Sequence, residues 1–348
     1  MSNKICKKQD IILADCEPEE LEELIDGLND VLGTNIVIKT CIANEGRSKR
    51  YNLWRYLVYA CFPIKFFINR RKYRYIICWQ QFYALFFCLY CRIFHVKNIN
   101  YIVACNYTYK PKKKIERLYF NFFRNNTRSD YMQKIHVLSH SYAKRCCDIM
   151  GISEEKVAVT SFGLPDTSMI WKDSKVEYSS YSLAIGRSNR DFDFLVDAWK
   201  WVDSRFKLLI ISDTYKPKID FPKNVTHRTD ISGDNQFPYI INSDLMIIPI
   251  GDGSICSGDT VLLKAMSYSK PVVVTSPSVL GEMYIDDGQN GLLLEKEPES
   301  FAKHIMELLV NKEKMLYLSN NARSKYEKYY SRYSMGVKLG EKIKINKE

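Results

Sequence analysis

Two arginines with the chemistry of a phosphate clamp follow a short apolar run, in the stretch "LAIGRSNRD". The apolar run is typical of a strand that ends at Gly186, and Arg187 and Arg190 come soon after it. A glycine lets the backbone approach a ligand closely, and guanidinium groups bind phosphate oxygens through charge-assisted, bidentate hydrogen bonds. This pattern is compatible with a diphosphate clamp, although arginines after a strand are also common as solvated surface residues.

A glycine-rich loop that leads into a helix is the second such feature. The stretch "GDGSICSGDTVLLKAM" follows a strand-like run ending in Pro249, and a helix is expected to begin near Asp259 or Thr260. A helix N-terminus presents unpaired backbone N–H groups and the positive end of the helix dipole, so a phosphate can dock there. The simpler alternative is a plain helix start that Ser257 or Asp259 caps, and capping does not exclude ligand binding.

Strand-like and helix-like runs alternate along both halves of the 348-residue chain. The strand-like runs include "DIILADC", "NIVIKTCI", "YRYIICW" and "INYIVAC" in the first half, and "YSLAIG", "FKLLIIS", "DLMIIPIG" and "KPVVVTS" in the second. This alternation predicts an α/β protein with two doubly wound, Rossmann-like domains, each built on a parallel sheet covered on both faces. Ligands of such sheets bind beyond the carboxyl ends of the strands, and the cleft between two sheets is the expected site.

The expected domain boundary lies in "PDTSMIWKDSKVEYSS", a polar stretch without sustained periodicity. Residues 1–165 are expected to form a basic, aromatic-rich domain, and residues 180–330 a second domain. Residues 331–348 are expected to form a helix that packs back on the N-terminal domain.

Composition excludes a disordered protein and argues against a metal site. Apolar residues make up 46% of the chain and aromatic residues 13%, enough to build a full core. The start "MSNKICKKQD" lacks the apolar region of a signal peptide, and eleven scattered cysteines indicate reduced thiols in a cytosol. Cys88 and Cys91 have the spacing of half a zinc site, but no second CxxC or HxxxH follows. We therefore expect both cysteines in the core and predict no metal.

The positive charge is concentrated in one block. The formal net charge is +11, and the segment from Gly46 to Ile115 holds fifteen Lys and Arg residues and no Asp or Glu. Bulky aromatic residues are interleaved with these cations, which suits the headgroup region of an anionic membrane. Single-stranded nucleic acid and a solvated surface without a partner are the alternatives, and no RNA- or DNA-binding motif accompanies the charge. The most apolar run, "WQQFYALFFCLYCRIF", has 16 residues and is shorter than the ~20 that span a bilayer, so a buried helix or a monotopic contact is expected.

Several stretches, taken together, resemble the signatures of GT-B glycosyltransferases of the large retaining group that uses nucleotide-sugar donors. They are "IHVLSHS", "GISEEKVAVTSFGLPD", "AIGRSNRDFDFLVDAW", "SDLMIIPI" and "SGDTVLLKAMSYSKPVVVTSPSVLGEMYIDDGQNGLLL". The resemblance covers roughly residues 135–330. The N-terminal third matches the family only in the order of its elements, so no catalytic residue is assigned there.

This resemblance implies two Rossmann-like domains that face each other across a cleft, with the nucleotide-sugar in the second. The reaction would retain configuration and use no metal and no cofactor, because cations and a helix N-terminus stabilise the leaving diphosphate of a UDP- or GDP-linked donor. By this resemblance, Arg187 matches the family's phosphate-binding arginine, and Arg190 replaces a lysine found slightly further on. The implied diphosphate contacts are Gly186, Arg187, Arg190 and the backbone N–H groups of Gly258, Asp259 and Thr260.

The chain departs from the family at two positions that matter for the donor. Relatives carry two glutamates eight positions apart, of which the first contacts the donor sugar and the second accepts the ribose hydroxyls. Cys256 and Lys264 occupy the matching positions, with Ser257 beside the first. An ammonium group can donate hydrogen bonds but cannot accept them, so donor recognition is expected to differ from the family pattern or to be lost.

Three functions follow as hypotheses. The first is a glycosyltransferase that acts on a glycan or lipid-linked acceptor in surface polysaccharide biosynthesis. It would work in the cytoplasm, peripherally bound through residues 46–115 to the inner face of the plasma membrane. The second is a non-catalytic GT-B homologue that binds a nucleotide-sugar or glycan. The third, a nucleic-acid binder, has the least support.

Overall fold

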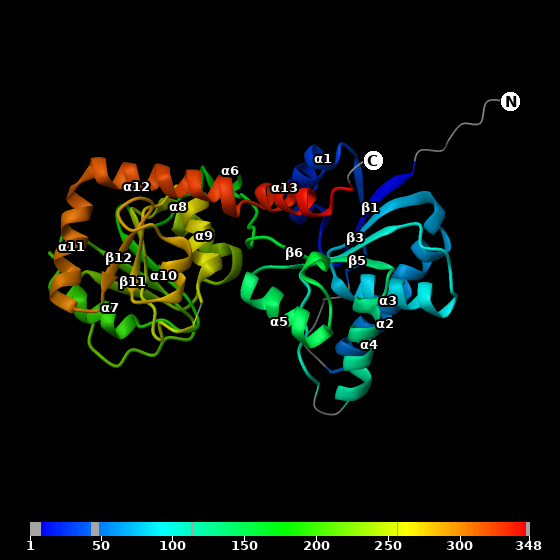
Figure 1. Ribbon diagram of the computed structural model, residues 1–348. Coiled ribbons are helices and arrows are strands. Elements are labelled where there is room, and N and C mark those ends of the chain that lie inside the picture. The colour runs from blue at the N-terminus through cyan, green and yellow to red at the C-terminus, as the bar shows by residue number, and fades with distance from the viewer. Residues whose placement is uncertain (1–7, 43–48, 113–114, 256, 346–348) are drawn as a thin grey trace. The chain divides into compact units, whose positions relative to one another are not determined.

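The computed structural model describes residues 8–42, 49–112, 115–255 and 257–345. The chain divides into two compact units. The N-terminal unit comprises Met1–Pro165 together with Arg332–Glu348, and the C-terminal unit comprises Asp166–Ser331. The last helix, α13 (Arg332–Ile343), therefore belongs to the N-terminal unit. Each unit is built on its own parallel sheet (Figure 1).

The N-terminal sheet has six parallel strands in the order β2-β1-β3-β4-β5-β6. They are β1 (Gln9–Ala14), β2 (Ile36–Thr40), β3 (Tyr73–Cys78), β4 (Tyr101–Ala104), β5 (Met132–Val137) and β6 (Val157–Val159). The middle strands read as short, nearly continuous apolar runs because helices cover both faces of the sheet. The prediction of a doubly wound N-terminal sheet is confirmed.

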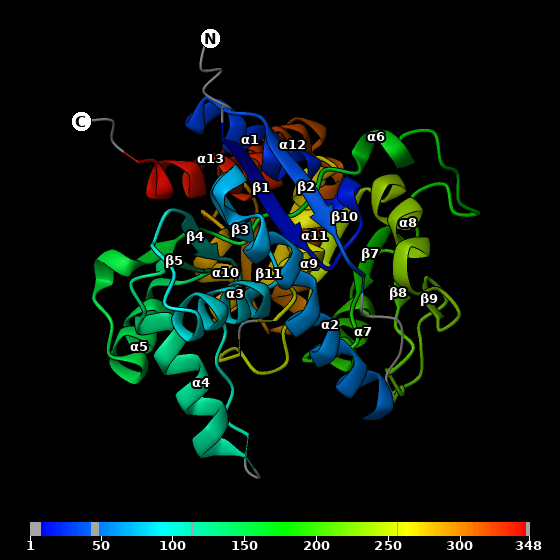
Figure 2. The same cartoon turned by 90° about the vertical axis from the view of Figure 1, so that its right-hand side faces the viewer.

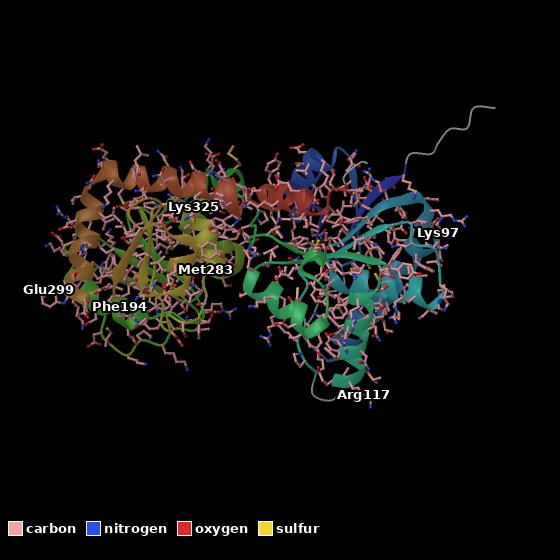
Figure 3. The ribbon with its side chains drawn as sticks, in the orientation of Figure 1. Lys97, Arg117, Phe194, Met283, Glu299 and Lys325 are labelled. Atoms are coloured by element: carbon pink, nitrogen blue, oxygen red, sulfur yellow. The ribbon has the colours of Figure 1, made fainter. Side chains whose placement is uncertain are left out.

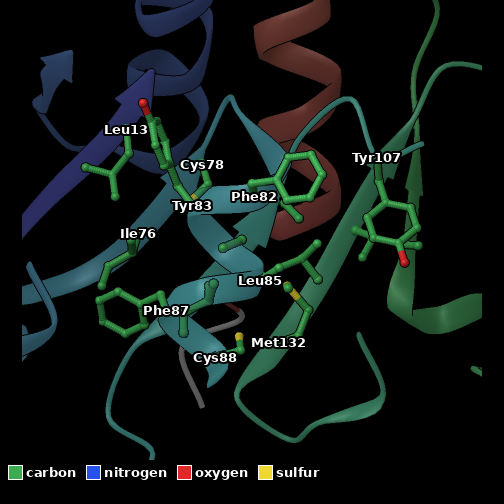
Figure 4. Close-up of a cluster of buried hydrophobic side chains, with 14 of the residues drawn as sticks. Leu13, Ile76, Cys78, Phe82, Tyr83, Leu85, Phe87, Cys88, Tyr107 and Met132 are labelled. Carbon is green, nitrogen blue, oxygen red and sulfur yellow. The ribbon is translucent and has the colours of Figure 1, made fainter. Parts of the chain in front are cut away.

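Helices cover both faces of this sheet (Figure 2), and the described helices divide between two cores, one on each face. The first core includes α1 (Glu22–Leu32) and α13. The second includes α2 (Lys49–Ile68), α3 (Gln81–Ile93), α4 (Glu116–Arg128) and α5 (His140–Met150). Figure 4 shows how α3 directs Phe82, Leu85 and Phe87 into the core beside the sheet. Cys88 and Cys91 are buried in the same core, as expected.

The C-terminal sheet also has six parallel strands, in the order β12-β11-β10-β7-β8-β9. They are β7 (Ser182–Ile185), β8 (Leu208–Ile211), β9 (Val225–Arg228), β10 (Leu245–Ile248), β11 (Val272–Ser276) and β12 (Leu292–Glu295). The strand order reverses direction between β7 and β10. The carboxyl ends of these two neighbours therefore meet at the topological switch point, where ligands of such sheets bind.

Seven α-helices accompany this sheet in the described part of the unit. They are α6 (Ser168–Trp171), α7 (Phe192–Trp199), α8 (Phe237–Asn242), α9 (Asp259–Ser267), α10 (Val279–Tyr284), α11 (Pro298–Val310) and α12 (Lys312–Lys325). Trp199 of α7 and Phe301 and Ile305 of α11 are buried in one core with the sheet. Helix α9 packs against β11 and α12, and its start follows the loop after β10. The C-terminal unit is thus doubly wound, as the sequence predicts. Over the described ranges, we find no helix with both the length and the hydropathy to cross a bilayer.

Helix α13 packs on α1 at a contact that leaves no room for side chains. A Cβ atom at Gly336 would lie 2.2 Å from the carbonyl oxygen of Leu24, and one at Gly27 would lie 2.3 Å from that of Tyr333. Because the obstructing atoms belong to the backbone, a larger residue would push the helices apart.

We expect Gly336→Ala to lower the free energy of unfolding by about 1–3 kcal/mol, the usual cost of overpacking. Glu341→Ala, on the exposed side of the same helix, is the control for the substitution itself. Thermal unfolding of the two variants followed by circular dichroism checks this expectation. Equal melting temperatures would show that the helices do not depend on this close approach.

His136 of β5 makes the N-terminal unit sensitive to acid. Its ring is fully buried, Nε2 lies 2.7 Å from Thr160 Oγ1, and burial lowers its pKa from about 6.5 to about 4. Between these values the unfolded chain binds a proton that the folded chain does not, so stability falls as pH drops from about 6.5 towards 4. A lowering of the pKa from 6.5 to about 4 corresponds to about 3 kcal/mol of stability.

The matched variant is His136→Gln, which keeps a polar side chain but does not titrate. Urea unfolding of wild type should give a free energy that declines between pH 6.5 and 4, and the variant should show a shallower decline. Parallel pH dependences in the two proteins would rule out His136 as the source. Carboxylates with lowered pKa values, such as Asp10, lose their contribution only at lower pH.

Candidate functional site

Two loops meet at the switch point of the C-terminal sheet, one after β7 (residues 186–191) and one after β10 (residues 249–258). The backbone N–H of Asp191 donates to the carbonyl of Pro249 at 2.8 Å, and that of Gly251 donates to the carbonyl of Asn189 at 3.1 Å. These bonds join the stretch with the two arginines to the glycine-rich stretch. The two motifs that the sequence singles out are therefore adjacent.

Asn189 fastens the two loops together through its side chain. Its Nδ2 donates to the carbonyl of Asp252 and to Ser257 Oγ, both at 3.0 Å, and its Oδ1 accepts from the N–H of Asp252 at 2.6 Å. Its backbone has φ +53°, a left-handed conformation that asparagine tolerates better than most residues. Sequence reasoning missed this residue, and the only available signal was an asparagine in a short loop after a strand.

Lys296, which follows β12, supports the same loops from the other side. Its ammonium group forms an ion pair with Asp191 and donates to the carbonyl of Ile250 at 3.2 Å. This residue was also missed, because nothing in its local sequence distinguishes it from a surface lysine.

Arg190 occupies the space between the two glycines that flank the site. A Cβ atom at Gly186 would lie 2.6 Å from Arg190 Nε, and one at Gly258 would lie 2.3 Å from its Nη2. The guanidinium group donates to the backbone carbonyls of Ile185, at 3.3 Å, and Ser188, at 3.1 Å. The structure thus brings Gly186, Arg190 and Gly258 together, and the glycines are needed because Arg190 fills the space.

The charge of Arg190 is only partly compensated. Within the described ranges, no carboxylate lies at ion-pair distance from its guanidinium group. Burial lowers its pKa to about 10, and the more distant charge of Asp259 acts in the opposite direction. The group remains a cation at neutral pH. A ligand anion that reached it would interact strongly, because the surrounding protein replaces much of the screening water.

Arg187 points to a different partner. Its side chain is 65% exposed, and its Nε donates to Asp213 Oδ1 at 2.8 Å, in the loop after β8. A phosphate that binds Arg187 must compete with this carboxylate. Local spacing in the sequence could not reveal the ion pair, since Asp213 lies 26 residues further along the chain.

The start of α9 has no side-chain cap. Gly258 is the N-cap residue, with φ +98°, and no side chain accepts a hydrogen bond in the capping position. The alternative in which Ser257 or Asp259 caps the helix is therefore wrong. Asp259 Oδ1 instead accepts from the N–H of Thr260 at 3.0 Å, and Ser257 Oγ accepts from Asn189. Of the three N–H groups assigned to a diphosphate, that of Thr260 is therefore already engaged.

Lys264 is buried inside the C-terminal unit, with 4% of its surface exposed. Its Nζ donates to Thr167 Oγ1 at 3.0 Å and lies 4.9 Å from the ring centre of Phe237 and 5.5 Å from that of Tyr268. Both distances suit cation–π contacts. Lys264 is therefore an interior residue and does not face solvent. Cys256, the other position where relatives carry glutamate, lies outside the described residues.

A positively charged hollow of about 400 Å³ lies beside Arg190. Its lining includes Arg187, Asn189, Arg190, Thr214, Lys216 and Lys218. Two acidic residues, Asp191 and Asp193, also line it, and each is within 4 Å of a lysine ammonium. The site can therefore attract an anion.

Replacement of Arg190 by alanine should weaken the binding of inorganic pyrophosphate to the full chain at least tenfold. A hydrogen bond to a charged group contributes about 1.5–3 kcal/mol, and tenfold corresponds to 1.4 kcal/mol. Arg205→Ala is the matched control, because Arg205 is exposed and pairs with Asp203. Calorimetric titration gives the affinities, and an Arg190→Ala protein that binds as tightly as Arg205→Ala would contradict the assignment.

The C-terminal unit matches a known protein family. Residues 180–311 match the family Glycosyl transferases group 1. An uncharacterised glycosyltransferase of Methanocaldococcus jannaschii is 31% identical over 153 residues, which are 42% of this chain and 42% of that protein. The matched segment thus spans less than half of either protein.

Solved structures of similar fold cover nearly the whole chain. A glycosyltransferase from Rickettsia africae has a TM-score of 0.60 at 12% identity, over 98% of this chain and 100% of that one. HepE of Anabaena, solved in complex with UDP-glucose, has a TM-score of 0.54 at 12% identity, over 96% and 98%. At this identity the similarity concerns the fold.

Both sheets have the doubly wound order of GT-B proteins, and the C-terminal unit carries the group 1 sequence signature. The chain therefore has the GT-B fold, and its C-terminal unit is similar in sequence to the group 1 glycosyltransferases.

Proposed function

We propose that the protein transfers a sugar from a UDP- or GDP-linked donor to a glycan or lipid-linked acceptor in surface polysaccharide biosynthesis. The observation that carries this proposal is the half-buried guanidinium group of Arg190 beside the N-terminus of α9, at the switch point of the C-terminal sheet. The diphosphate of the donor would bind there, near Gly186, Arg187 and Gly258. UDP-glucose in HepE supports a nucleotide-sugar as the donor class.

In this proposal the protein acts mainly by stabilising charge on the leaving group. As the bond between the anomeric carbon and the diphosphate oxygen breaks, the bonding electrons remain on that oxygen. Arg190 is already positioned and largely desolvated, so little reorganisation is required when the charge develops. A metal ion is not required for this step, and the resemblance to the retaining group suggests that the sugar keeps its configuration.

A non-catalytic GT-B homologue is the second candidate, and Lys264 is the observation that favours it. At the position of the ribose-binding carboxylate the chain has an ammonium group that is turned towards Thr167 and two aromatic rings. The ribose would therefore lack its usual acceptor. A protein that binds a nucleotide-sugar or glycan without turnover is compatible with this arrangement.

The proposed place of action is the cytoplasmic face of the plasma membrane. Fifteen cations and no carboxylate between Gly46 and Ile115 support attraction to anionic lipid headgroups. A membrane-bound acceptor would then diffuse in two dimensions past the enzyme. We propose no nucleic-acid partner.

A panel of UDP- and GDP-sugars should contain at least one donor that wild-type protein hydrolyses or transfers. With that donor, Arg187→Ala should lower kcat about 10²-fold, as expected when one contact to the leaving group is lost. Asp213→Asn is the matched control, because it breaks the same ion pair and leaves Arg187 free to bind phosphate. Equal losses in both variants would contradict a phosphate role for Arg187. Donor binding without turnover by wild type would favour the non-catalytic candidate.

A further inference from the structure

The outward face of α2 is apolar. Five of its residues are exposed apolar or thiol side chains, namely Trp54, Leu57, Cys61, Ile64 and Ile68, and we call them the α2 stripe. The exposed fractions of its four apolar members lie between 40% and 68%. Between Trp54 and Ile68 the only other exposed residue is Lys65. A surface helix normally directs polar residues to solvent. The exposed apolar face of α2 therefore indicates a binding surface.

The members of the α2 stripe share one side of the helix. They follow one another at intervals of three and four residues, which places them within an arc of about 80° at 100° per residue. The stripe extends about 21 Å along the helix axis at 1.5 Å per residue. The opposite side of α2 is committed to the core, where Tyr59, Phe66 and Phe67 are buried. The helix is therefore apolar on two sides.

The apolar surface continues beyond the C-terminal end of α2. The ring of Phe67 lies 5.6 Å from that of Phe94, and Phe94 and its neighbour Ile93 are both more than half exposed at the end of α3. A second exposed apolar patch, Ile93 and Phe94, therefore lies near the C-terminal end of α2, where Phe94 packs on the buried Phe67.

Cations border this surface. Lys65 is on α2, and Arg71 and Lys72 are exposed immediately after it. Lys97, in the segment between α3 and β4, is exposed and lies at the edge of the unit in Figure 3. Among the ion pairs of the described residues, none includes Lys65, Arg71, Lys72 or Lys97. The border is therefore rich in uncompensated positive charge.

These charges decide between two partners for the stripe. A second copy packed on the stripe would bring two sets of bordering cations close together, with no carboxylate in the block to offset the repulsion. The stripe also spans only about two heptads, fewer than the three or four typical of a stable coiled coil. An anionic lipid surface suits both the apolar α2 stripe and the cations beside it. Anionic headgroups neutralise the cations, and the apolar side chains enter the boundary between headgroups and acyl chains.

We propose that α2 lies in the plane of an anionic membrane and inserts the α2 stripe among the lipids. The inference deepens the membrane part of the proposed function, which the cations alone support only as electrostatic adsorption. It does not require donor binding or catalysis. Lys65, Arg71 and Lys72 would contact headgroup phosphates at the edge of the inserted helix.

The test is partitioning of the full chain onto vesicles of phosphatidylcholine with about a third phosphatidylglycerol. The double variant Leu57→Ser, Ile64→Ser should partition at least tenfold more weakly than wild type. The control is Val310→Ser, Leu316→Ser, which changes two residues of similar exposure in the C-terminal unit. All substituted side chains are more than a third exposed, so melting temperatures should stay close to that of wild type. Equal partitioning of the two double variants would overturn the proposal.

Cys61 provides a second readout within the stripe. An environment-sensitive fluorophore attached to the protein should shift to the blue on these vesicles, and the shift should disappear in Cys61→Ser. An unshifted spectrum would place the stripe in water and overturn the proposal. Oxidative crosslinking through Cys61 without vesicles would identify a second copy as the partner and also overturn it. Nucleotide binding, measured on the same variants, should be unchanged. The membrane proposal and the transferase proposal can therefore fail independently of each other.

Discussion

The half-buried guanidinium group of Arg190 is the constraint on which the loops of the C-terminal unit depend. Its hydrogen bonds go to backbone carbonyls, so the loop after β7 must wrap around it. Gly186 and Gly258 have no room for a Cβ atom because Arg190 fills the space beside them. A desolvated cation held by neutral dipoles is costly without an anion. This cost explains why several hydrogen bonds hold the loops around Arg190. The uncompensated positive charge suits the binding of a diphosphate.

Polar side chains hold this cation and its surroundings in place. Asn189 joins the loops after β7 and β10, and Lys296 fastens both to the end of β12. Gly253 approaches the carbonyl of Pro277 so closely that a Cβ atom would lie 2.3 Å from it. The site is therefore organised before any ligand arrives. Lys264 uses its charge in a different way, since its contacts to Thr167 and two rings stabilise the interior of the unit.

Local sequence patterns predicted the two sheets because buried parallel strands must be apolar over several consecutive residues. Only the resemblance to GT-B glycosyltransferases assigned the stretch from Gly186 to Arg190 and the glycine-rich stretch to one diphosphate; their adjacency follows from the strand order of the folded sheet, which brings two carboxyl ends together. Spacing could not predict pairs that form only when distant segments fold together. The contacts of Arg187 with Asp213 and of Lys264 with Thr167 are of this kind. The sequence alone showed that cations are concentrated in residues 46–115. The exposed apolar face of α2 could not be predicted, because the sequence does not show which apolar residues of this helix are buried in the core. The assignment of site residues to a diphosphate stays a prediction.

A crystal structure of the protein in complex with UDP tests the central claim most directly. The account predicts that diphosphate oxygens lie about 3 Å from the guanidinium group of Arg190 and from a backbone N–H at the start of α9, a distance typical of hydrogen bonds. Arg187 should then have exchanged Asp213 for the phosphate. Phosphates bound away from Arg190, with the guanidinium group still bonded to the carbonyls of Ile185, Ser188 and Asn189, would contradict the account.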